Sequence, residues 1–243
     1  MTTPQFAATA ARVLKQLRND RRTIALLVVM PSVLIGLFAW LFNSGQMFQR
    51  VGPVVLALFP FLMMFLVTSI TTLRERTSGT LERLMTTPMT KSGIILGYAT
   101  AFALFAVVQS LIAVLFAVYV CDLTLAGSMA ALLVFAVADA LLGTAMGLFL
   151  SAFARTEFQA IQFFPLFIVP QIILGGVFMP IDQMPRVLEI LARCFPFTYG
   201  IEGVANIAAG LGGWDVWRPF LVVVAFVVGF IVLGSLTLPR RTR

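Results

Sequence analysis

Six long apolar runs divide this sequence, and they constrain its fold more than any other feature does. Each run supplies roughly the 20 residues that a helix needs to cross the ~30 Å hydrocarbon core of a bilayer. Backbone groups in lipid must be satisfied internally, and the runs lack the alternation typical of strands, so we expect transmembrane helices. The expected spans are Thr23–Phe42, Val51–Thr71, Ser92–Val120, Met129–Phe153, Phe158–Met179 and Pro219–Leu238.

Composition favours an all-α integral membrane protein over other classes. Of the 243 residues, 60% are hydrophobic and 11% are charged, which is more apolar surface than a soluble core of this size needs. The net charge of +7 would suit a nucleic-acid-binding protein, but the basic residues are short flanks beside the apolar runs, so we expect no nucleic-acid partner. Because the sequence has no histidine and its two cysteines lie far apart, we expect no metal site.

The distribution of basic residues predicts the orientation of the spans. With both termini in the cytoplasm, the basic residues of the N-terminal segment, of the link after the second span and of the C-terminal end all lie inside, with Arg155. Only Arg50, Arg186, Arg193 and Arg218 then lie outside. The positive-inside rule therefore favours this orientation.

Residues 1–22 precede the first span and have an amphipathic pattern. Thr3 is a candidate N-cap with Pro4 at the first helical position. We expect an interfacial helix on the inner leaflet, with a disordered basic tail as the alternative. The first run is too long for a signal core, so we expect no cleavable signal peptide and a single six-span domain over residues 23–243. The apolar face comprises Phe6, Ala10, Val13, Leu14 and Leu17, and Arg12, Lys15 and Arg18 lie off it.

A short charged segment, Glu75–Pro88, separates the second and third runs. It is too short for a domain, yet it carries an apolar stripe at Leu81, Leu84 and Met85 that a simple linker would not need. We interpret it as a cytosolic helix that docks on a soluble partner, with charges setting the register. The alternative is a solvated loop whose arginines only follow the positive-inside rule. The candidate docking residues are Arg74, Glu75, Arg76, Gly79, Thr80, Leu81, Glu82, Leu84, Met85 and Pro88.

The segment before the last span, about residues 176–216, is rich in proline and glycine but also carries apolar pieces too short to span. We expect two short helices that dip into the outer leaflet or cap it, sheltered by protein or a water-filled cavity. An ordinary surface loop is the alternative. The residues that mark this hairpin are Gly175, Gly176, Pro180, Pro185, Pro196, Tyr199 and Glu202.

Asp139 is the one acidic residue within an expected span, and intramembrane carboxylates are costly and often functional. Counted from the outer turn between the third and fourth spans, Gln109 lies at a similar depth on the neighbouring helix. We therefore expect a hydrogen-bonded Gln109–Asp139 pair. A proton-linked or substrate-linked site at Asp139 is the alternative.

Cys121 and Cys194 both fall on the outer side in this topology. An oxidising exterior permits a disulfide that would pin the outer hairpin to the third span. Two unpaired thiols fit the sequence equally well.

Two motifs together resemble a known family. They are Glu-Arg-Thr-Ser-Gly-Thr-Leu-Glu-Arg-Leu-Met-Thr-Thr-Pro, from Glu75, and the region Gly-Gly-Val-Phe-Met-Pro-Ile-Asp-Gln-Met-Pro to Pro-Phe-Thr-Tyr-Gly-Ile-Glu-Gly, from Gly175. With the basic amphipathic start and six spans, the chain resembles type-2 ATP-binding-cassette (ABC) exporter permeases of the daunorubicin-resistance and nodulation types. The resemblance covers essentially the whole chain.

The resemblance implies a division of labour in a bacterial plasma membrane. Such permeases pair as dimers, here a homodimer, and each half docks on one of two copies of a separate ATPase subunit. The link at about residues 74–88 would be the coupling helix, and the hairpin, about Phe178–Ala209, would gate the exit. The N-terminal helix, Pro4–Asp20, would lie near the ATPase.

The sequence lacks the Gly-x-x-x-x-Gly-Lys-Ser/Thr loop that cradles nucleotide phosphates. ATP and Mg are therefore expected on the partner subunit, and we predict that this chain is not itself an enzyme and holds no cofactor. The leading hypothesis is export of a hydrophobic or amphipathic, drug-like or lipid-like, substrate from the lipid membrane. The alternatives are an ion-gradient-driven secondary transporter and a non-transporting membrane assembly factor.

Overall fold

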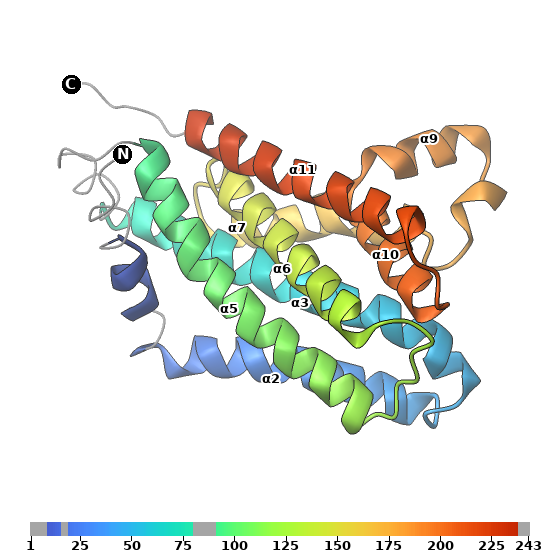
Figure 1. Cartoon of the computed structure of the whole chain (residues 1–243). Coiled ribbons are helices and arrows are strands. Elements are labelled where there is room, and N and C mark those ends of the chain that lie inside the picture. Colours follow the sequence, from blue (N-terminus) through green and yellow to red (C-terminus); the bar gives the residue numbers. More distant parts are fainter. Residues whose placement is uncertain (1–8, 16–18, 80–90, 238–243) are drawn as a thin grey trace.

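The computed structural model describes residues 9–15, 19–79 and 91–237, and all regular structure in these ranges is helical (Figure 1). Residues 9–15 form a short N-terminal helix. The long helices are α2 (Arg21–Leu41), α3 (Gln46–Thr77), α5 (Lys91–Tyr119), α6 (Met129–Ser151) and α11 (Trp214–Thr237). The shorter pieces are α7 (Glu157–Phe163), the π-helix η1 (Phe164–Ile168), α8 (Val169–Leu174), the 3-10 turn η2 (Ile181–Gln183), α9 (Arg186–Cys194) and α10 (Pro196–Ala208).

Within the described residues, 6 helices are long and apolar enough to cross a membrane, so the predicted all-α fold with six spans is confirmed. Their bounds are Thr23–Leu41, Gln46–Thr77, Gly93–Tyr119, Met129–Ser151, Glu157–Leu174 and Trp214–Thr237.

The second span is longer than its apolar run. α3 has 32 residues, about 48 Å at 1.5 Å per residue, against a hydrocarbon core of ~30 Å. The prediction ended this span at Thr71, where the sequence becomes polar. The helix continues to Thr77 because the charged side chains of its last turns find partners elsewhere in the protein.

The fifth span is composite, since α7, η1 and α8 follow one another without an intervening loop. Pro165 and Pro170 lie in this stretch and remove backbone donors, which is a common origin of a π-helical turn. The predicted span reached Met179, but the helix ends at Leu174. Gly176 then has φ +91°, a conformation that glycine adopts without the strain of a side chain.

The core of the bundle is the pair α3 and α6. Gly143 of α6 lies against the carbonyl oxygen of Phe61, and a Cβ atom built at Gly147 would come within 2.7 Å of the carbonyl oxygen of Phe65. Two small residues four apart let helix backbones approach closely in membranes. This spacing is visible in the sequence, but our sequence analysis did not use it.

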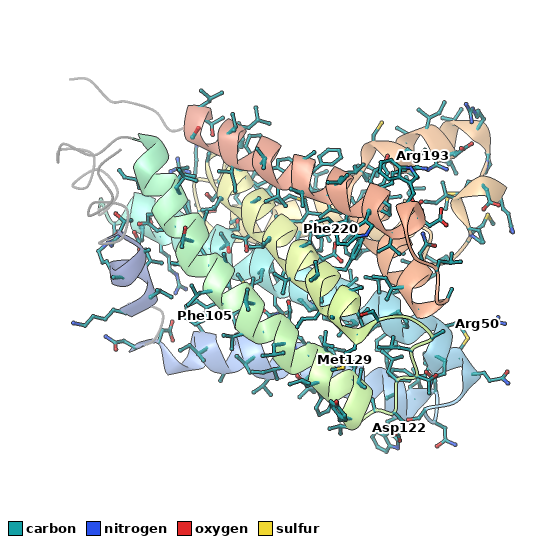
Figure 2. All side chains as sticks on the ribbon, viewed as in Figure 1. Arg50, Phe105, Asp122, Met129, Arg193 and Phe220 are labelled. Carbon is teal, nitrogen blue, oxygen red and sulfur yellow. The ribbon has the colours of Figure 1, made fainter. Side chains whose placement is uncertain are left out.

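The two ends of the bundle carry different features. The N-terminal helix lies beside one end, whereas α9 and α10 lie at the other (Figure 1). Arg50, Asp122 and Arg193 also lie at the end that carries α9 and α10 (Figure 2). The predicted pair of short helices before the last span is therefore present as α9 and α10.

Candidate functional site

The end of α3 carries a carboxylate that is buried and paired within the chain. The side chain of Glu75 is 4% exposed, and Arg12 Nη2 donates to its Oε2 over 3.0 Å. The same Arg12 nitrogen donates to the Tyr98 hydroxyl of α5 over 2.7 Å. Beside this pair, Thr9 packs closely on Gly97 of α5. The N-terminal helix is thus fastened to α3 and α5 at one point.

The residues on either side of Glu75 connect the same turn of α3 to α7 and to α6. Arg74 forms a two-pronged ion pair with Glu157 at the start of α7, with nitrogen–oxygen distances of 2.7 Å and 3.0 Å. Arg76 donates to the carbonyl oxygen of Ser151 at the end of α6. Three consecutive charged residues therefore join α3 to the N-terminal helix, α6 and α7. We call Arg74, Glu75 and Arg76 with these partners the α3 junction.

One prediction about this region is wrong. Glu75 was expected to dock on a partner protein, but its side chain is buried against Arg12 and cannot reach a partner surface. Arg12, predicted to lie off the apolar face of the N-terminal helix, is half-buried and donates to Glu75 and Tyr98.

The boundary of the predicted docking segment also changes. Residues 74–77 belong to the last turn of α3, and Gly79, at φ +72°, follows the helix end with its N–H donating to the carbonyl of Arg76. A glycine in this conformation is a common helix stop. The docking roles of Arg74, Arg76 and Gly79 stay predictions. The other candidate docking residues, Thr80, Leu81, Glu82, Leu84, Met85 and Pro88, lie outside the described residues.

The Arg74–Glu157 pair is expected to add little stability, because the two side chains are 60% and 49% exposed. Replacing Arg74 with alanine should lower the free energy of unfolding by about 1 kcal/mol or less. Thermal unfolding of the purified variants Arg74→Ala, Glu157→Gln and the double variant measures the coupling. A cost well above this range for Arg74→Ala alone would mean that Arg74 has a second, stronger partner.

At the opposite end, α10 packs into the bundle by close contacts. Gly200 lies against Asp139 of α6, with a Cβ atom built at Gly200 coming 2.8 Å from the Asp139 Cγ. Gly203 lies against the Phe135 ring, one turn earlier on α6. Phe197 stacks on Phe61 of α3 with ring centroids 4.5 Å apart. The helix α10 is therefore held by α6 side chains that pack against its glycines and by one ring stack on α3.

Hydrogen bonds fix the start of α10 and its approach from α9. Gln171 of α8 accepts from the Phe197 N–H over 3.3 Å. Thr198 donates to the carbonyl of Ala192 over 2.7 Å, and Tyr199 donates to the carbonyl of Arg193 over 2.9 Å. The other predicted hairpin residues lie along the same segment, with Gly175 and Gly176 after α8, Pro180 before η2, Pro185 before α9, and Pro196 and Glu202 in α10.

The predicted hydrogen bond between Gln109 and Asp139 is wrong. Both side chains are fully buried, but neither amide atom of Gln109 and neither carboxyl oxygen of Asp139 has a hydrogen-bond partner among the described residues. The depth argument holds, since Ser110 donates to the carbonyl of Ala136 over 3.0 Å. Two residues at equal depth on neighbouring helices need not face each other, however, because adjacent residues of a helix point about 100° apart around its axis. Ser110 contacts α6, and Asp139 lies against Gly200 instead.

Of the two possibilities left open for Cys121 and Cys194, a disulfide or two unpaired thiols, the structure has the second. Both cysteines are free: Cys121 is buried in the turn after α5, whereas Cys194 is exposed at the end of α9. Burial raises the pKa of the Cys121 thiol, which disfavours the reactive thiolate. Among the residues that the structure describes, no group of three or more histidine, cysteine, aspartate or glutamate side chains could hold a metal ion.

The contacts that Arg12, Gly200 and Gly203 make were not predicted from the sequence. No local sequence signal marked the contacts of Arg12, because its partners Glu75 and Tyr98 lie on other helices. The two glycines lie in the quoted motif Pro-Phe-Thr-Tyr-Gly-Ile-Glu-Gly, and their three-residue spacing could have suggested a close helix contact.

Comparisons with known proteins agree with this architecture. Residues 4–208 match the family model described as ABC-2 type transporter. The chain is 26% identical over 203 residues to ABC transporter G family member 20 of Dictyostelium discoideum, which covers 82% of this chain and 28% of that protein. It is 29% identical over 179 residues to the probable multidrug ABC transporter permease YbhR of Escherichia coli strain K12, covering 72% of this chain and 49% of the relative.

A third relative is the linearmycin resistance permease protein LnrN of Bacillus subtilis, 27% identical over 139 residues, which cover 57% of this chain and 36% of that protein. The matched part is about half the length of YbhR and less of the other two relatives.

Proposed function

Because the chain belongs to the ABC-2 type transporter family, we propose that it is the transmembrane subunit of an ATP-driven exporter of hydrophobic or amphipathic molecules. The family match over residues 4–208 carries this assignment. Two relatives are named as a probable multidrug permease and a linearmycin resistance permease, which favours drug-like cargo. ATP hydrolysis belongs to a separate subunit, which binds ATP and Mg.

The segment that follows Gly79 docks on that ATPase from the cytoplasm of a bacterial cell, where both termini also lie. ATP must bind better to the closed pair of ATPase subunits than to the open pair if its binding is to drive a rearrangement of the membrane spans. The contacts of the α3 junction support a route by which closure of the ATPase pair could move the spans. Since the junction joins the turn before the docking segment to the N-terminal helix, α6 and α7, a displacement of the segment moves several helices together.

The outer end supplies the gate. α10 contacts α6 through Gly200 and Gly203 and contacts α3 through Phe197. A tilt of α6 relative to α3 would therefore weaken the packing of α10 against both helices. In our proposal α9 and α10 re-enter the outer leaflet, and two copies of the chain form the pathway between them.

The apolar stripe of the docking segment, Leu81, Leu84 and Met85, is here called the docking stripe. When it is made acidic, we expect the ATPase to be lost from the purified complex. Leu81→Asp with Leu84→Asp removes the apolar contact and adds charge at the centre of the proposed interface, where apolar anchors contribute most of the affinity. The measurement is a mild-detergent pull-down of the tagged chain from its native membrane, with mass spectrometry of the proteins retained.

The matched control is Leu188→Asp with Leu191→Asp, two exposed leucines of α9 at the far end of the bundle. This variant should retain a roughly equimolar ATPase that carries the nucleotide-binding loop. If no ATPase accompanies the unaltered chain at any detergent strength, the exporter assignment fails.

One observation favours a second candidate function. Asp139 is fully buried with no hydrogen-bond partner for either carboxyl oxygen among the described residues, which is a feature of ion-coupled transporters. Transport that stops with an uncoupler but survives ATP depletion would favour this ion-gradient-driven mechanism. The reverse pattern supports the exporter.

A further inference from the structure

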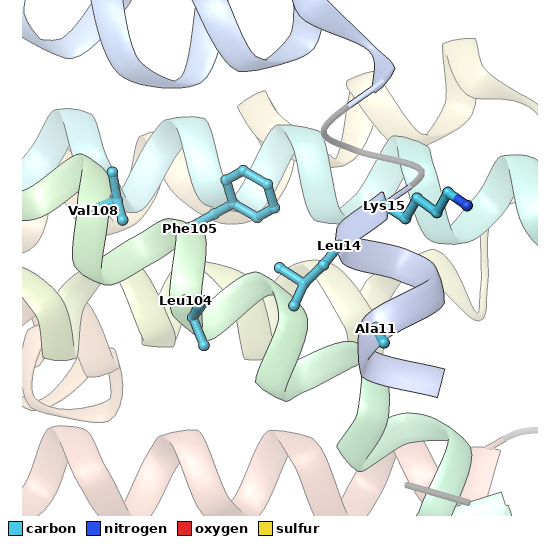
Figure 3. A pocket seen from close by; sticks show the side chains of 6 residues that line it. All are labelled: Ala11, Leu14, Lys15, Leu104, Phe105 and Val108. Atoms are coloured by element: carbon cyan, nitrogen blue, oxygen red, sulfur yellow. The ribbon is translucent and has the colours of Figure 1, made fainter. Parts of the chain in front are cut away.

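A pocket of about 530 Å³ lies between the N-terminal helix and α5 (Figure 3). Five of its lining side chains are apolar, and the sixth is Lys15. We propose that this pocket binds one anionic phospholipid from the leaflet on the side of the α3 junction. The lining residues are Ala11, Leu14, Lys15, Leu104, Phe105 and Val108.

The pocket runs from the level of the α3 junction toward the bilayer centre. Tyr98 marks the level at which α5 contacts Arg12. Leu104 and Val108 lie about 9 Å and about 15 Å further along the same helix, at 1.5 Å per residue. Both are within the predicted third span, and their side chains are 54% and 46% exposed. The deep part of the pocket is thus lined by surface that an acyl chain can reach from the membrane.

Lys15 lines the pocket from the N-terminal helix, and its side chain extends away from Leu104, Phe105 and Val108, so its ammonium lies on the side of the pocket opposite these residues (Figure 3). Its side chain is exposed, and no ion pair within the described part of the chain engages it. An ammonium on one side of the pocket and an apolar wall on the other are complementary to a ligand with an anionic head and an apolar tail. A zwitterionic headgroup would offer Lys15 as much repulsion as attraction, so we commit to a lipid with net negative charge.

Other ligand chemistries fit this pocket less well. A soluble anion would leave the apolar wall of Leu104, Phe105 and Val108 uncovered. A cationic drug would be repelled by Lys15. An anionic phospholipid satisfies both parts, and the leaflet that contacts the pocket supplies it without a separate entry path.

Occupancy of this pocket also affects the α3 junction. Leu14 and Lys15 belong to the same short helix as Arg12, which pairs with Glu75. A lipid held between this helix and α5 keeps Arg12 in place. This consequence rests on the proposed function, whereas lipid binding itself does not.

Native mass spectrometry of the purified full chain tests the binding. The protein is equilibrated with equal amounts of phosphatidylglycerol and phosphatidylcholine, and the lipids retained after mild activation are counted. The unaltered chain should retain phosphatidylglycerol preferentially. Lys15→Ala should reduce that preference about fivefold, the factor that corresponds to about 1 kcal/mol for one basic residue near the lipid surface.

A second variant separates the apolar part of the site from its charge. Leu104→Trp fills the pocket and should remove the retained lipid whatever its headgroup, whereas Leu115→Trp, on the same helix outside the pocket, should not. Arg155→Ala removes an exposed arginine elsewhere and should leave the preference unchanged.

Three results would overturn the assignment. They are equal retention of both lipids by the unaltered chain, an equal loss for Lys15→Ala and Arg155→Ala, and full retention by Leu104→Trp. Size-exclusion profiles show that each variant is folded. Neither an ATPase nor a transported substrate is present in this experiment. A negative result would therefore reject the lipid site without rejecting the exporter assignment, and failure of the exporter assignment would not reject the lipid site.

Discussion

Replacing Arg12 with alanine is expected to lower the free energy of unfolding by about 3 kcal/mol, because it leaves the buried Glu75 carboxylate without its cation. Breaking a buried ion pair by removing one partner costs about 3–5 kcal/mol. We place this pair at the lower end because the Arg12 side chain is 32% exposed, although that of Glu75 is only 4% exposed. Thermal unfolding in detergent, followed by tryptophan fluorescence, measures the loss.

Two further variants assign this loss to the ion pair. Arg155→Ala removes an exposed charge elsewhere in the protein and should leave stability nearly unchanged. Glu75→Gln in the Arg12→Ala background removes the unpaired charge and should recover part of the stability, as a coupled pair does in a double-mutant cycle. An Arg12→Ala protein as stable as the unaltered chain would show that this pair does not hold the N-terminal helix.

The functional expectation for Arg12→Ala follows from the α3 junction. The variant should still bind the ATPase, since Arg12 is not in the proposed docking stripe, but it should export less substrate per ATP hydrolysed. Vesicle transport and ATP hydrolysis are measured on the same preparation. Loss of ATPase binding instead would place Arg12 in the docking surface and not behind it.

The features that the sequence predicted well are set by local properties. The length of an apolar run determines whether a helix can cross the bilayer, so the six spans followed from the sequence. Prolines mark the starts of the short helices α9 and α10, and glycines follow the end of α10, so these helices were also predictable. The extension of α3 to Thr77 was not, because its polar last turns depend on Glu157, Arg12 and Ser151, which are distant in sequence.

The features that the sequence predicted poorly depend on how each helix is rotated and on which neighbour it meets. Gln109 and Asp139 were placed at the right depth, but one step along α5 puts Ser110 on the side that contacts α6. Arg12 was placed off the apolar face of the N-terminal helix from the spacing of the apolar residues, which does not reveal that its partner Glu75 lies on a different helix. Such pairings become visible only once the helices are packed together.

Replacing Gly200 with alanine is expected to destabilise the protein by about 1–3 kcal/mol, the usual cost of an extra methyl group in a well-packed core. The new Cβ atom would lie against the Asp139 carboxyl group, 2.8 Å from its Cγ and 3.0 Å from Oδ2. Asp139 is fully buried and has little room to withdraw, so α10 must shift away from α6. Gly229→Ala in α11 is the matched control, because a Cβ atom there meets nothing within 4 Å.

Asp139→Ala identifies the cause of the clash, since it removes the group that Gly200 contacts. A buried carboxyl group without a hydrogen-bond partner contributes little stability, so this change alone should be nearly neutral. In the Asp139→Ala background, Gly200→Ala should then cost less than it does in the unaltered chain, and unfolding measurements on the four proteins give the coupling energy. If Gly200→Ala is as mild as Gly229→Ala, or if Asp139→Ala does not reduce the cost of Gly200→Ala, then the contact between α6 and α10 does not hold α10 in place. Export by the Gly200→Ala protein should fall together with its stability, because the displaced helix is the one that we propose as the gate.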